Sequence, residues 1–134
     1  MSEWFGRPVL HVRDAEASLL FYVEGLGFTC PWRYEEKGRA RVAQVERRDC
    51  AIILSDRWPE KAGAGLVFIS VNAAPEAQAA ALDALRLELE GRGVSVREGW
   101  WGYRVLVVDD PDGNQLFLNY PNETASEGMG EARR

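Results

Sequence analysis

The side chains that most often do chemistry are scarce in this chain. Its 134 residues include one histidine, His11, and two cysteines, Cys30 and Cys50. The cysteines have no CxxC or zinc-like spacing, so we interpret them as reduced packing residues rather than a disulfide. A single imidazole without clustered carboxylates would make a poor metal site. We therefore expect His11 to line a binding site or to form a hydrogen bond there.

Aromatic side chains are more numerous than a core of this size needs, because five residues are tryptophan. Trp101 and Tyr103 alternate onto one face of a strand predicted for residues 101–108, whereas Trp32, Trp58 and Trp100 fall at predicted strand ends or in loops. Exposed rings near a concave surface indicate stacking on a flat ligand or contact with another subunit. For each tryptophan alone, a half-buried place at the edge of the core is an equally open interpretation.

The elements that would position these residues follow a pattern that occurs twice. In the first half, a strand over residues 7–13 precedes a helix that Asp14 can cap and that Gly25 and Gly27 end. Three strands follow, and the second half repeats the same order. The further elements are predicted at residues 28–34, 40–45, 50–55, 66–71, 76–90 (a helix), 94–97, 101–108 and 115–119. The pattern predicts an α+β fold of two βαβββ modules, at about residues 7–56 and 65–121.

The composition is typical of a folded domain, with 46% hydrophobic and 28% charged residues. We predict a single domain over residues 1–122 and a flexible tail over residues 123–134. No apolar stretch approaches the length of a membrane span and the N-terminus does not resemble a signal peptide, so we expect a cytoplasmic protein without a membrane partner. The net charge of −5 disfavours nucleic acid and suits a neutral or cationic small ligand.

The predicted strands carry apolar residues on both faces. One face, which includes Leu10, Val12, Ile52 and Leu54, is expected to form the core beneath the helices. The opposite face collects Ile53, Leu66, Phe68 and Phe117, together with the polar residues Arg7, His11, Ser55, Ser70 and Asn119. A mainly apolar surface with sparse polar groups is typical of a small-molecule site. This face could instead pack against the other half or against a partner subunit, and both arrangements could hold in one dimer.

Two motifs of the chain resemble a known family. VLHVRDAEASLLFYVEGLGF near the start and DPDGNQLFL near the end are similar to segments of the glyoxalase, bleomycin-resistance and extradiol dioxygenase superfamily, also called vicinal oxygen chelate proteins. The resemblance covers roughly residues 7–121 and rests on the order and spacing of the motifs in a duplicated chain. It implies a curved mixed sheet that forms a cup, with the helices on its outer face.

The metal-ligand positions of the family hold other residues in this chain. By the family's spacing, these positions fall at Arg7, near Ile53, at Leu66 and at Phe117. None of these side chains binds a divalent metal under ordinary conditions, because such a site needs carboxylate, imidazole or thiolate donors. The resemblance therefore implies a cup without a catalytic metal or other cofactor.

Within the superfamily, the chain is most similar to the metal-free bleomycin-resistance proteins, which bind the antibiotic rather than transform it. Pro8 matches the place where the family's N-terminal arm crosses to a partner subunit, which implies a homodimer with an exchanged N-terminal arm. In that family, aromatic residues stack on the flat part of the drug in a groove between subunits. The residues that we expect to bind the ligand are His11, Trp32, Ser55, Phe68, Trp101, Gly102, Tyr103 and Phe117.

Three hypotheses of function remain open from the sequence. The leading one is a metal-independent homodimer that sequesters a planar, antibiotic-like compound, neutral or cationic. The second is a superfamily enzyme of isomerase, lyase or dioxygenase type, in which metal-free chemistry would use His11 as a general base and Arg7 to stabilise an anion. No second acid or base is apparent. The third is a structural or regulatory dimer with no small ligand.

Overall fold

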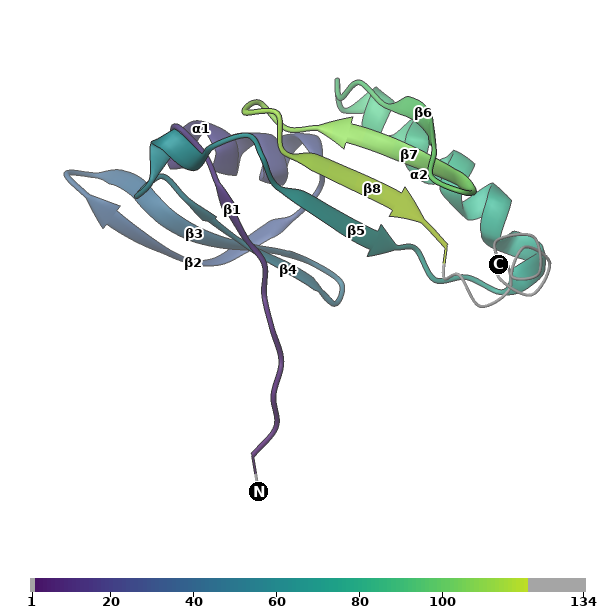
Figure 1. The fold of residues 1–134 in the computed structure, drawn as a ribbon, viewed down its shortest axis with the longest axis horizontal. Coiled ribbons are helices and arrows are strands. Elements are labelled where there is room, and N and C mark those ends of the chain that lie inside the picture. Colours follow the sequence, from purple (N-terminus) through teal and green to yellow (C-terminus); the bar gives the residue numbers. More distant parts are fainter. Residues whose placement is uncertain (1, 121–134) are drawn as a thin grey trace. The chain divides into compact units, whose positions relative to one another are not determined.

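The computed structural model describes residues 2–120 and confirms the repeated βαβββ order (Figure 1). The first half contains β1 (Val9–His11), α1 (Ala15–Leu20), the π-helical turn η1 (Phe21–Gly25), β2 (Thr29–Glu36), β3 (Arg39–Arg47) and β4 (Cys50–Ser55). The second half contains β5 (Leu66–Ser70), α2 (Gln78–Gly91), β6 (Arg97–Trp100), β7 (Arg104–Asp109) and β8 (Gln115–Asn119). Short 3₁₀ turns precede β5 (η2, Pro59–Lys61) and α2 (η3, Pro75–Ala77). The predicted tail at 123–134 lies outside the described residues.

The chain divides into two compact units. The first comprises residues 2–65 and 110–115, and the second comprises residues 66–109 and the described residues from 116 onward. The break after residue 65 falls where the sequence predicts the second module to begin. Residues 110–115, which belong to the DPDGN motif and the start of β8, lie in the first unit although they come late in the chain. Among residues 2–120, no helix is long and apolar enough to cross a membrane.

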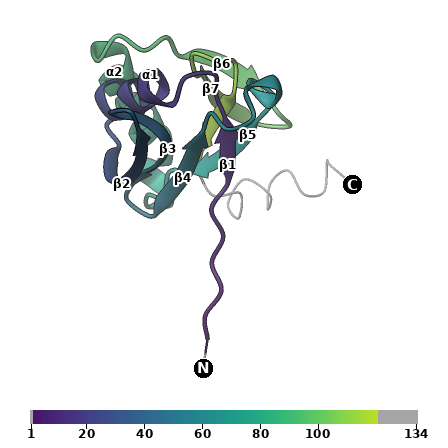
Figure 2. The same cartoon turned by 90° about the vertical axis from the view of Figure 1, so that its left-hand side faces the viewer.

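The sheet of the first unit has the strand order β1-β4-β3-β2. β1 is parallel to β4, whereas β3 is antiparallel to both β4 and β2. α1 lies along one face of this sheet (Figure 2). Beneath the helix, the predicted core residues Leu10, Val12, Ile52 and Leu54 are buried, and Tyr22 of the helical segment is fully buried with them. The alternation of apolar residues therefore predicted the buried face of β1 and β4.

The first helix begins as expected and ends with an unexpected turn. The carboxylate of Asp14 accepts hydrogen bonds from the backbone amides of Glu16 and Ala17, at 3.0 and 3.2 Å, which satisfies amides that have no partner within the helix. The α-helix passes into π-helix at residue 21, and Gly27 follows with a φ of +75°. A π-helical turn holds one more residue than an α-helical turn, so its position could not be predicted from apolar spacing.

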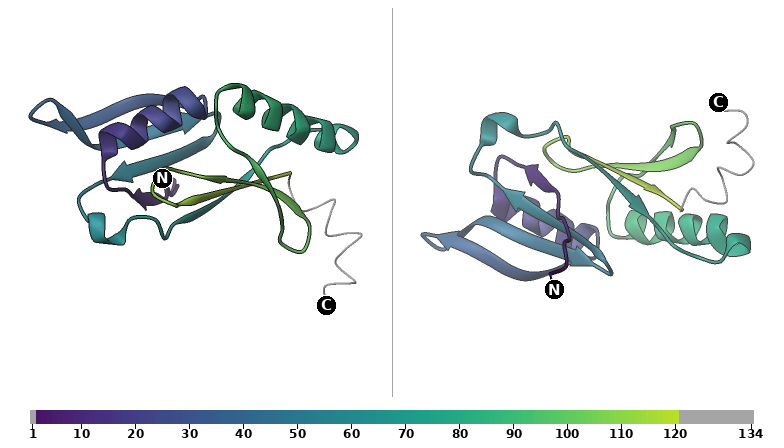
Figure 3. Two further views of the ribbon diagram at one scale, coloured as in Figure 1. Left: turned by 90° about the horizontal axis from the view of Figure 1, so that it is seen from above. Right: turned by 60° about the horizontal axis from the view of Figure 1, so that its bottom comes forward.

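The sheet of the second unit has the matching order β5-β8-β7-β6, and α2 lies along one of its faces (Figure 3). Arg104 of β7 pairs with Asp83 of α2 at 2.9 Å and with Glu98 of β6 at 3.0 Å. Arg86 of α2 pairs with the same Glu98 at 2.7 Å. These ion pairs join the helix to the β6–β7 hairpin.

Two predicted strands of the second unit differ from the structure. Residues 94–96 precede β6, and residues 101–103 form the turn between β6 and β7 rather than the start of a strand. The prediction that Trp101 and Tyr103 alternate on one face of a strand is therefore wrong. Gly102 has a φ of +77°, a left-handed conformation that glycine adopts without a steric penalty, and this reverses the chain.

Candidate functional site

Four of the eight predicted ligand-binding residues contact one another in the second unit. The Phe68 ring lies 5.6 Å from the Trp101 ring and 6.4 Å from the Tyr103 ring, measured between centroids. The Trp101 ring meets the Phe117 ring edge to face at 5.3 Å. These distances are those of favourable aromatic pairs. We call Phe68, Trp101, Tyr103 and Phe117 the aromatic cluster.

The aromatic cluster is positioned by two adjacent strands and a tight turn. Phe68 lies in the middle of β5 and Phe117 in the middle of β8, which is the neighbour of β5 in the sheet. Trp101 and Tyr103 come from the turn around Gly102, where the backbone amide of Trp101 donates to the carbonyl of Tyr103 at 2.9 Å. The Trp101 side chain remains 51% exposed. The cluster thus presents a large ring surface that is held in place by its neighbours.

Of the remaining predicted residues, Gly102 lies in the turn of the second unit, whereas His11, Trp32 and Ser55 belong to the first unit, on the sheet face opposite α1. Directly paired residues of neighbouring strands place their side chains on the same face. Register pairing therefore defines two rows across this face: Val9, Ile53, Gln44 and Trp32, followed by His11, Ser55, Val42 and Tyr34. We call this surface the open face.

Trp32 is fixed on the open face by a glutamine that the sequence did not single out. Its indole Nε1 donates to Gln44 Oε1 at 3.1 Å, and Arg7 Nη1 donates to the same oxygen at 2.5 Å. Gln44 Nε2 donates to Glu46 Oε2 at 2.6 Å. Trp32 lies within β2, beside a register irregularity, rather than at a strand end as predicted. The sequence signal that could have identified Gln44 is the alternation along β3, which places Val42, Gln44 and Glu46 on the same face.

His11 and Ser55 lie opposite each other on β1 and β4. The Ser55 hydroxyl oxygen accepts a hydrogen bond from the backbone amide of Arg57 at 3.2 Å. His11 Nδ1 is buried and has no hydrogen-bond partner among the described residues. The imidazole meets the ring of Trp58 edge to face at 5.9 Å. Trp58, which is not one of the eight predicted ligand-binding residues, thus adds another aromatic ring beside His11.

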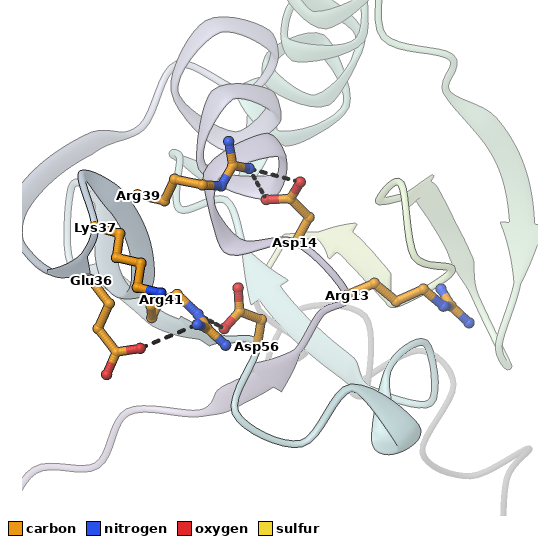
Figure 4. A pocket seen from close by; sticks show the side chains of 7 residues that line it. All are labelled: Arg13, Asp14, Glu36, Lys37, Arg39, Arg41 and Asp56. Atoms are coloured by element: carbon orange, nitrogen blue, oxygen red, sulfur yellow. Dashed lines mark hydrogen bonds and ion pairs between the residues drawn. The ribbon is translucent and has the colours of Figure 1, made fainter.

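A charged pocket lies elsewhere in the first unit (Figure 4). Its lining consists of charged residues only: Arg13, Asp14, Glu36, Lys37, Arg39, Arg41 and Asp56. Arg39 pairs with Asp14 at 2.9 Å, and Arg41 pairs with Asp56 at 2.7 Å. Because five of these seven charged groups pair with one another and no ring lines the pocket, it is a poor fit for a planar ligand. None of the eight predicted residues lines it.

The family's metal-ligand positions hold side chains that do not fit a divalent metal. Arg7 and Ile53 lie in the first unit, where Arg7 donates to Gln44. Leu66 begins β5, and Phe117 belongs to the aromatic cluster. Guanidinium, aliphatic and phenyl groups do not donate to such a cation. Within residues 2–120, no three His, Cys, Asp or Glu side chains are grouped so that they could hold a metal ion.

The chain belongs to the Glyoxalase/Bleomycin resistance protein/Dioxygenase superfamily, which matches residues 4–118. This confirms the family expected from the two motifs. The α+β fold of two βαβββ modules is likewise that of the family's solved structures. No curated protein matches the chain significantly.

Three solved structures illustrate the likeness. The antibiotic-binding protein TnmS3 from Streptomyces sp. CB03234 is 27% identical, with a TM-score of 0.64 over 90% of this chain and 98% of that chain. The bleomycin-binding protein of Streptomyces verticillus, complexed with copper(II)-bleomycin, is 25% identical, with a TM-score of 0.66 over 90% and 99%. Lactoylglutathione lyase from Agrobacterium tumefaciens is 14% identical, with a TM-score of 0.64 over 90% and 96%, and shares the fold alone.

Proposed function

We propose that this protein is a metal-independent small-molecule-binding protein that sequesters a planar, antibiotic-like compound. The observation that carries the proposal is the aromatic cluster, in which Trp101 is half exposed while Phe68 and Phe117 hold its ring in place. Aromatic pairs contribute about 0.5–1.5 kcal/mol beyond the area that they bury. A ring that is already oriented also loses little conformational freedom when a flat ligand stacks on it.

The polar groups of the open face suit an orienting role in such binding. Small-molecule sites are mainly apolar and carry a few polar groups that fix the orientation of the ligand. His11 and Trp32 both lie on the open face beside apolar residues such as Ile53. We therefore include His11, Trp32 and Ser55 with the aromatic cluster and Gly102 as proposed ligand-binding residues.

Two of the similar structures support a binding role rather than a catalytic one. One is of an antibiotic-binding protein and the other is of a bleomycin-binding protein in complex with copper(II)-bleomycin. At sequence identities of 27% and 25%, the ligands of these two proteins do not identify the ligand of this chain. We accordingly propose a ligand class, planar and aromatic, and not a particular antibiotic.

The N-terminal arm supports a homodimer as the functional form. Residues 2–8 form neither helix nor strand; Arg7 and Pro8 are hydrogen-bonded to Gln44 and Ile53 of the first sheet, and the chain before them extends away from that sheet (Figure 1). They carry Trp4, which is 96% exposed, and Phe5, which is 80% exposed. Adjacent exposed aromatic rings are typical of surfaces that another protein covers. We propose that a second copy of the chain covers them by exchange of the arm, and that the dimer acts in the cytoplasm.

One observation favours the alternative, an enzyme of the same family. His11 Nδ1 is buried without a partner and could accept a proton from a substrate, with Arg7 stabilising the resulting anion. Against this, the register neighbour of His11 is Ser55, whose neutral hydroxyl is not a second acid or base for proton transfer. Turnover of a lactoylglutathione-type hemithioacetal that is lost in His11→Ala would favour the enzyme over the binding protein.

The binding proposal is tested by titrating the protein with bleomycin and with a panel of flat heteroaromatic natural products while tryptophan fluorescence is followed. At least one compound should quench the fluorescence saturably, and Trp101→Ala should weaken its affinity by roughly tenfold or more, as expected when a stacking ring of about 1–3 kcal/mol is removed. Trp100→Ala is the matched control, because Trp100 is adjacent but belongs to none of the ring contacts of the cluster. The absence of quenching across the panel, or equal losses in both variants, would contradict the proposal.

A further inference from the structure

Arg7, two residues before Val9, extends the open face, and its guanidinium group pairs with no carboxylate among the described residues. Arg7 Nη1 donates to Gln44 Oε1 at 2.5 Å, and this oxygen is uncharged. Arg7 forms no ion pair with any residue in the described range 2–120. This sets it apart from arginines such as Arg39, Arg41 and Arg104, each of which pairs with a carboxylate.

Two contacts determine how the Arg7 guanidinium is presented. Its carbon lies 5.3 Å from the centroid of the Phe5 ring, a cation–π distance. Gln44 receives one of its N–H groups. A guanidinium has five N–H donors in one plane, so most of them remain available to a planar acceptor such as a carboxylate.

Gln44 links this cation to Trp32 and at the same time separates it from an anion. Its Oε1 accepts from both Arg7 and Trp32, and its Nε2 donates to Glu46. Arg7 and Trp32 are donors and can bond only to the amide oxygen, whereas the Glu46 carboxylate is an acceptor and can bond only to the amide nitrogen. The Gln44 side-chain amide therefore has one orientation. Gln44 is buried, which restricts it further. Arg7 and Trp32 therefore lie on one side of the amide and Glu46 on the other.

A second polar atom on the same face also lacks a partner. His11 follows Arg7 and Val9 with a spacing of two residues along the chain, which places all three on one side of an extended strand. Its buried Nδ1 has no hydrogen-bond partner among the described residues. A buried polar atom without a partner calls for an explanation, and a bound polar ligand is one. This observation is independent of the Arg7 contacts.

We propose that the open face binds an acidic oxygen group of the ligand, a carboxylate or its equivalent, at Arg7, with the ligand's ring system against Trp32. The proposal rests on the proposed function, since it assigns a charge to the planar ligand. It replaces the cationic ligand suggested by the overall charge of −5 with an anionic one, because the local donors outweigh a dispersed net charge at short range. Glu46 opposes an anion, but its Oε2 is engaged by Gln44 on the far side of the amide.

Three probes with the same ring system and different charge test this inference: anthraquinone carboxylate, the neutral anthraquinone carboxamide and an aminomethyl anthraquinone cation. Affinities are measured by isothermal titration calorimetry. The carboxylate should bind roughly tenfold more tightly than the carboxamide, the size expected for a charge-assisted hydrogen bond. Arg7→Gln should abolish this preference, because it weakens the binding of the carboxylate far more than that of the neutral carboxamide. Arg48→Gln, which replaces an exposed arginine in a turn, is the matched control. It should change neither the preference for the carboxylate nor the affinity for the carboxamide.

The outcomes separate this inference from the proposed function. Equal affinities for the three probes, tighter binding of the cation, or a preference for the carboxylate that survives Arg7→Gln would overturn the inference while the binding function stands. Binding of none of the three probes would contradict the proposed function, and the inference with it. Loss of the preference in Arg48→Gln as well would show a general charge effect and would also overturn the assignment to Arg7.

Discussion

Asn114 donates a hydrogen bond from its side-chain Nδ2 to the backbone carbonyl of His11 at 3.0 Å, which joins residues 103 positions apart. The same amide group donates to Asp110 at 3.0 Å, and its oxygen accepts from the backbone amide of Gly65 at 2.7 Å. Asn114 is fully buried. The DPDGN motif therefore holds the end of β1 and Gly65 in place within the first unit, and it has no direct part in the proposed ligand chemistry.

Replacing Asn114 should destabilise the first unit strongly. Asn114→Leu has a similar shape but leaves the Gly65 amide and the His11 carbonyl without their partner, and each unsatisfied buried group costs about 1–3 kcal/mol. We expect the free energy of unfolding in urea to fall by roughly 2–4 kcal/mol. Asn72→Leu, at an exposed position, is the control and should change it by about 0.5 kcal/mol or less. Equal effects of the two substitutions would refute the structural role of Asn114.

The hydroxyl of Tyr22 should contribute measurably to stability. It donates to Asp110 Oδ2 at 3.1 Å, and burial is the largest cause of a raised pKa for this tyrosine, which keeps the hydroxyl protonated. Tyr22→Phe removes the hydrogen bond and should lower the free energy of unfolding by about 1 kcal/mol. Tyr34→Phe is the matched control, because Tyr34 is half exposed and its hydrogen bond to Glu36 lies at the surface, and it should have a smaller effect. A larger loss in Tyr34→Phe would contradict the assignment.

Two glycines with positive φ should respond differently to a methyl group. Gly63 has a φ of +93° and a Cβ there would lie 2.4 Å from the backbone oxygen of Asp112, whereas Gly38 has a φ of +78° and open space around it. Gly38→Ala carries only the strain of the left-handed conformation, about 1 kcal/mol. Gly63→Ala adds a backbone clash that cannot relax by side-chain rotation. Thermal melting should show a clearly lower Tm for Gly63→Ala, and equal Tm values would argue against the contact between Gly63 and Asp112.

The contribution of Glu98 to stability should depend on pH. The hydrogen bond from Arg104 is the largest cause of its lowered pKa. Since the folded pKa lies below the unfolded one, the stabilisation is complete above the unfolded pKa of about 4.3 and is lost as the pH falls through the folded pKa. Glu98→Gln should therefore lower the Tm modestly at neutral pH, because the pair is half exposed, and should approach the wild-type Tm in strong acid. A Tm difference that stays constant with pH would contradict this account.

The sequence predicted the parts of the fold that local pattern controls. Leu10 and Val12 marked a buried strand face, and Asp14 marked the start of a helix. The β6 strand was misplaced because Val94 and Val96, which are buried in the segment before β6, alternate as residues of a strand do. Gly102 was the only local sequence signal of the turn at residues 101–103, which separates β6 from β7.

The candidate site was less predictable because its contacts join distant positions. The spacing in the chain did not show that Phe68 and Phe117 would meet Trp101, since this depends on strand order and on the turn at Gly102. The Gln44 network depends on the register between β2 and β3. The family resemblance identified the aromatic positions of the site, which periodicity could not do. It gave no role to Gln44 or Trp58.

The central claim, a retained planar ligand, is tested most directly by native mass spectrometry of the protein purified from its own host. We predict a species whose excess mass is an aromatic organic compound, present in the wild type and depleted in Trp101→Ala but not in Trp100→Ala. Protein that carries a stoichiometric divalent metal and no organic compound would contradict the account.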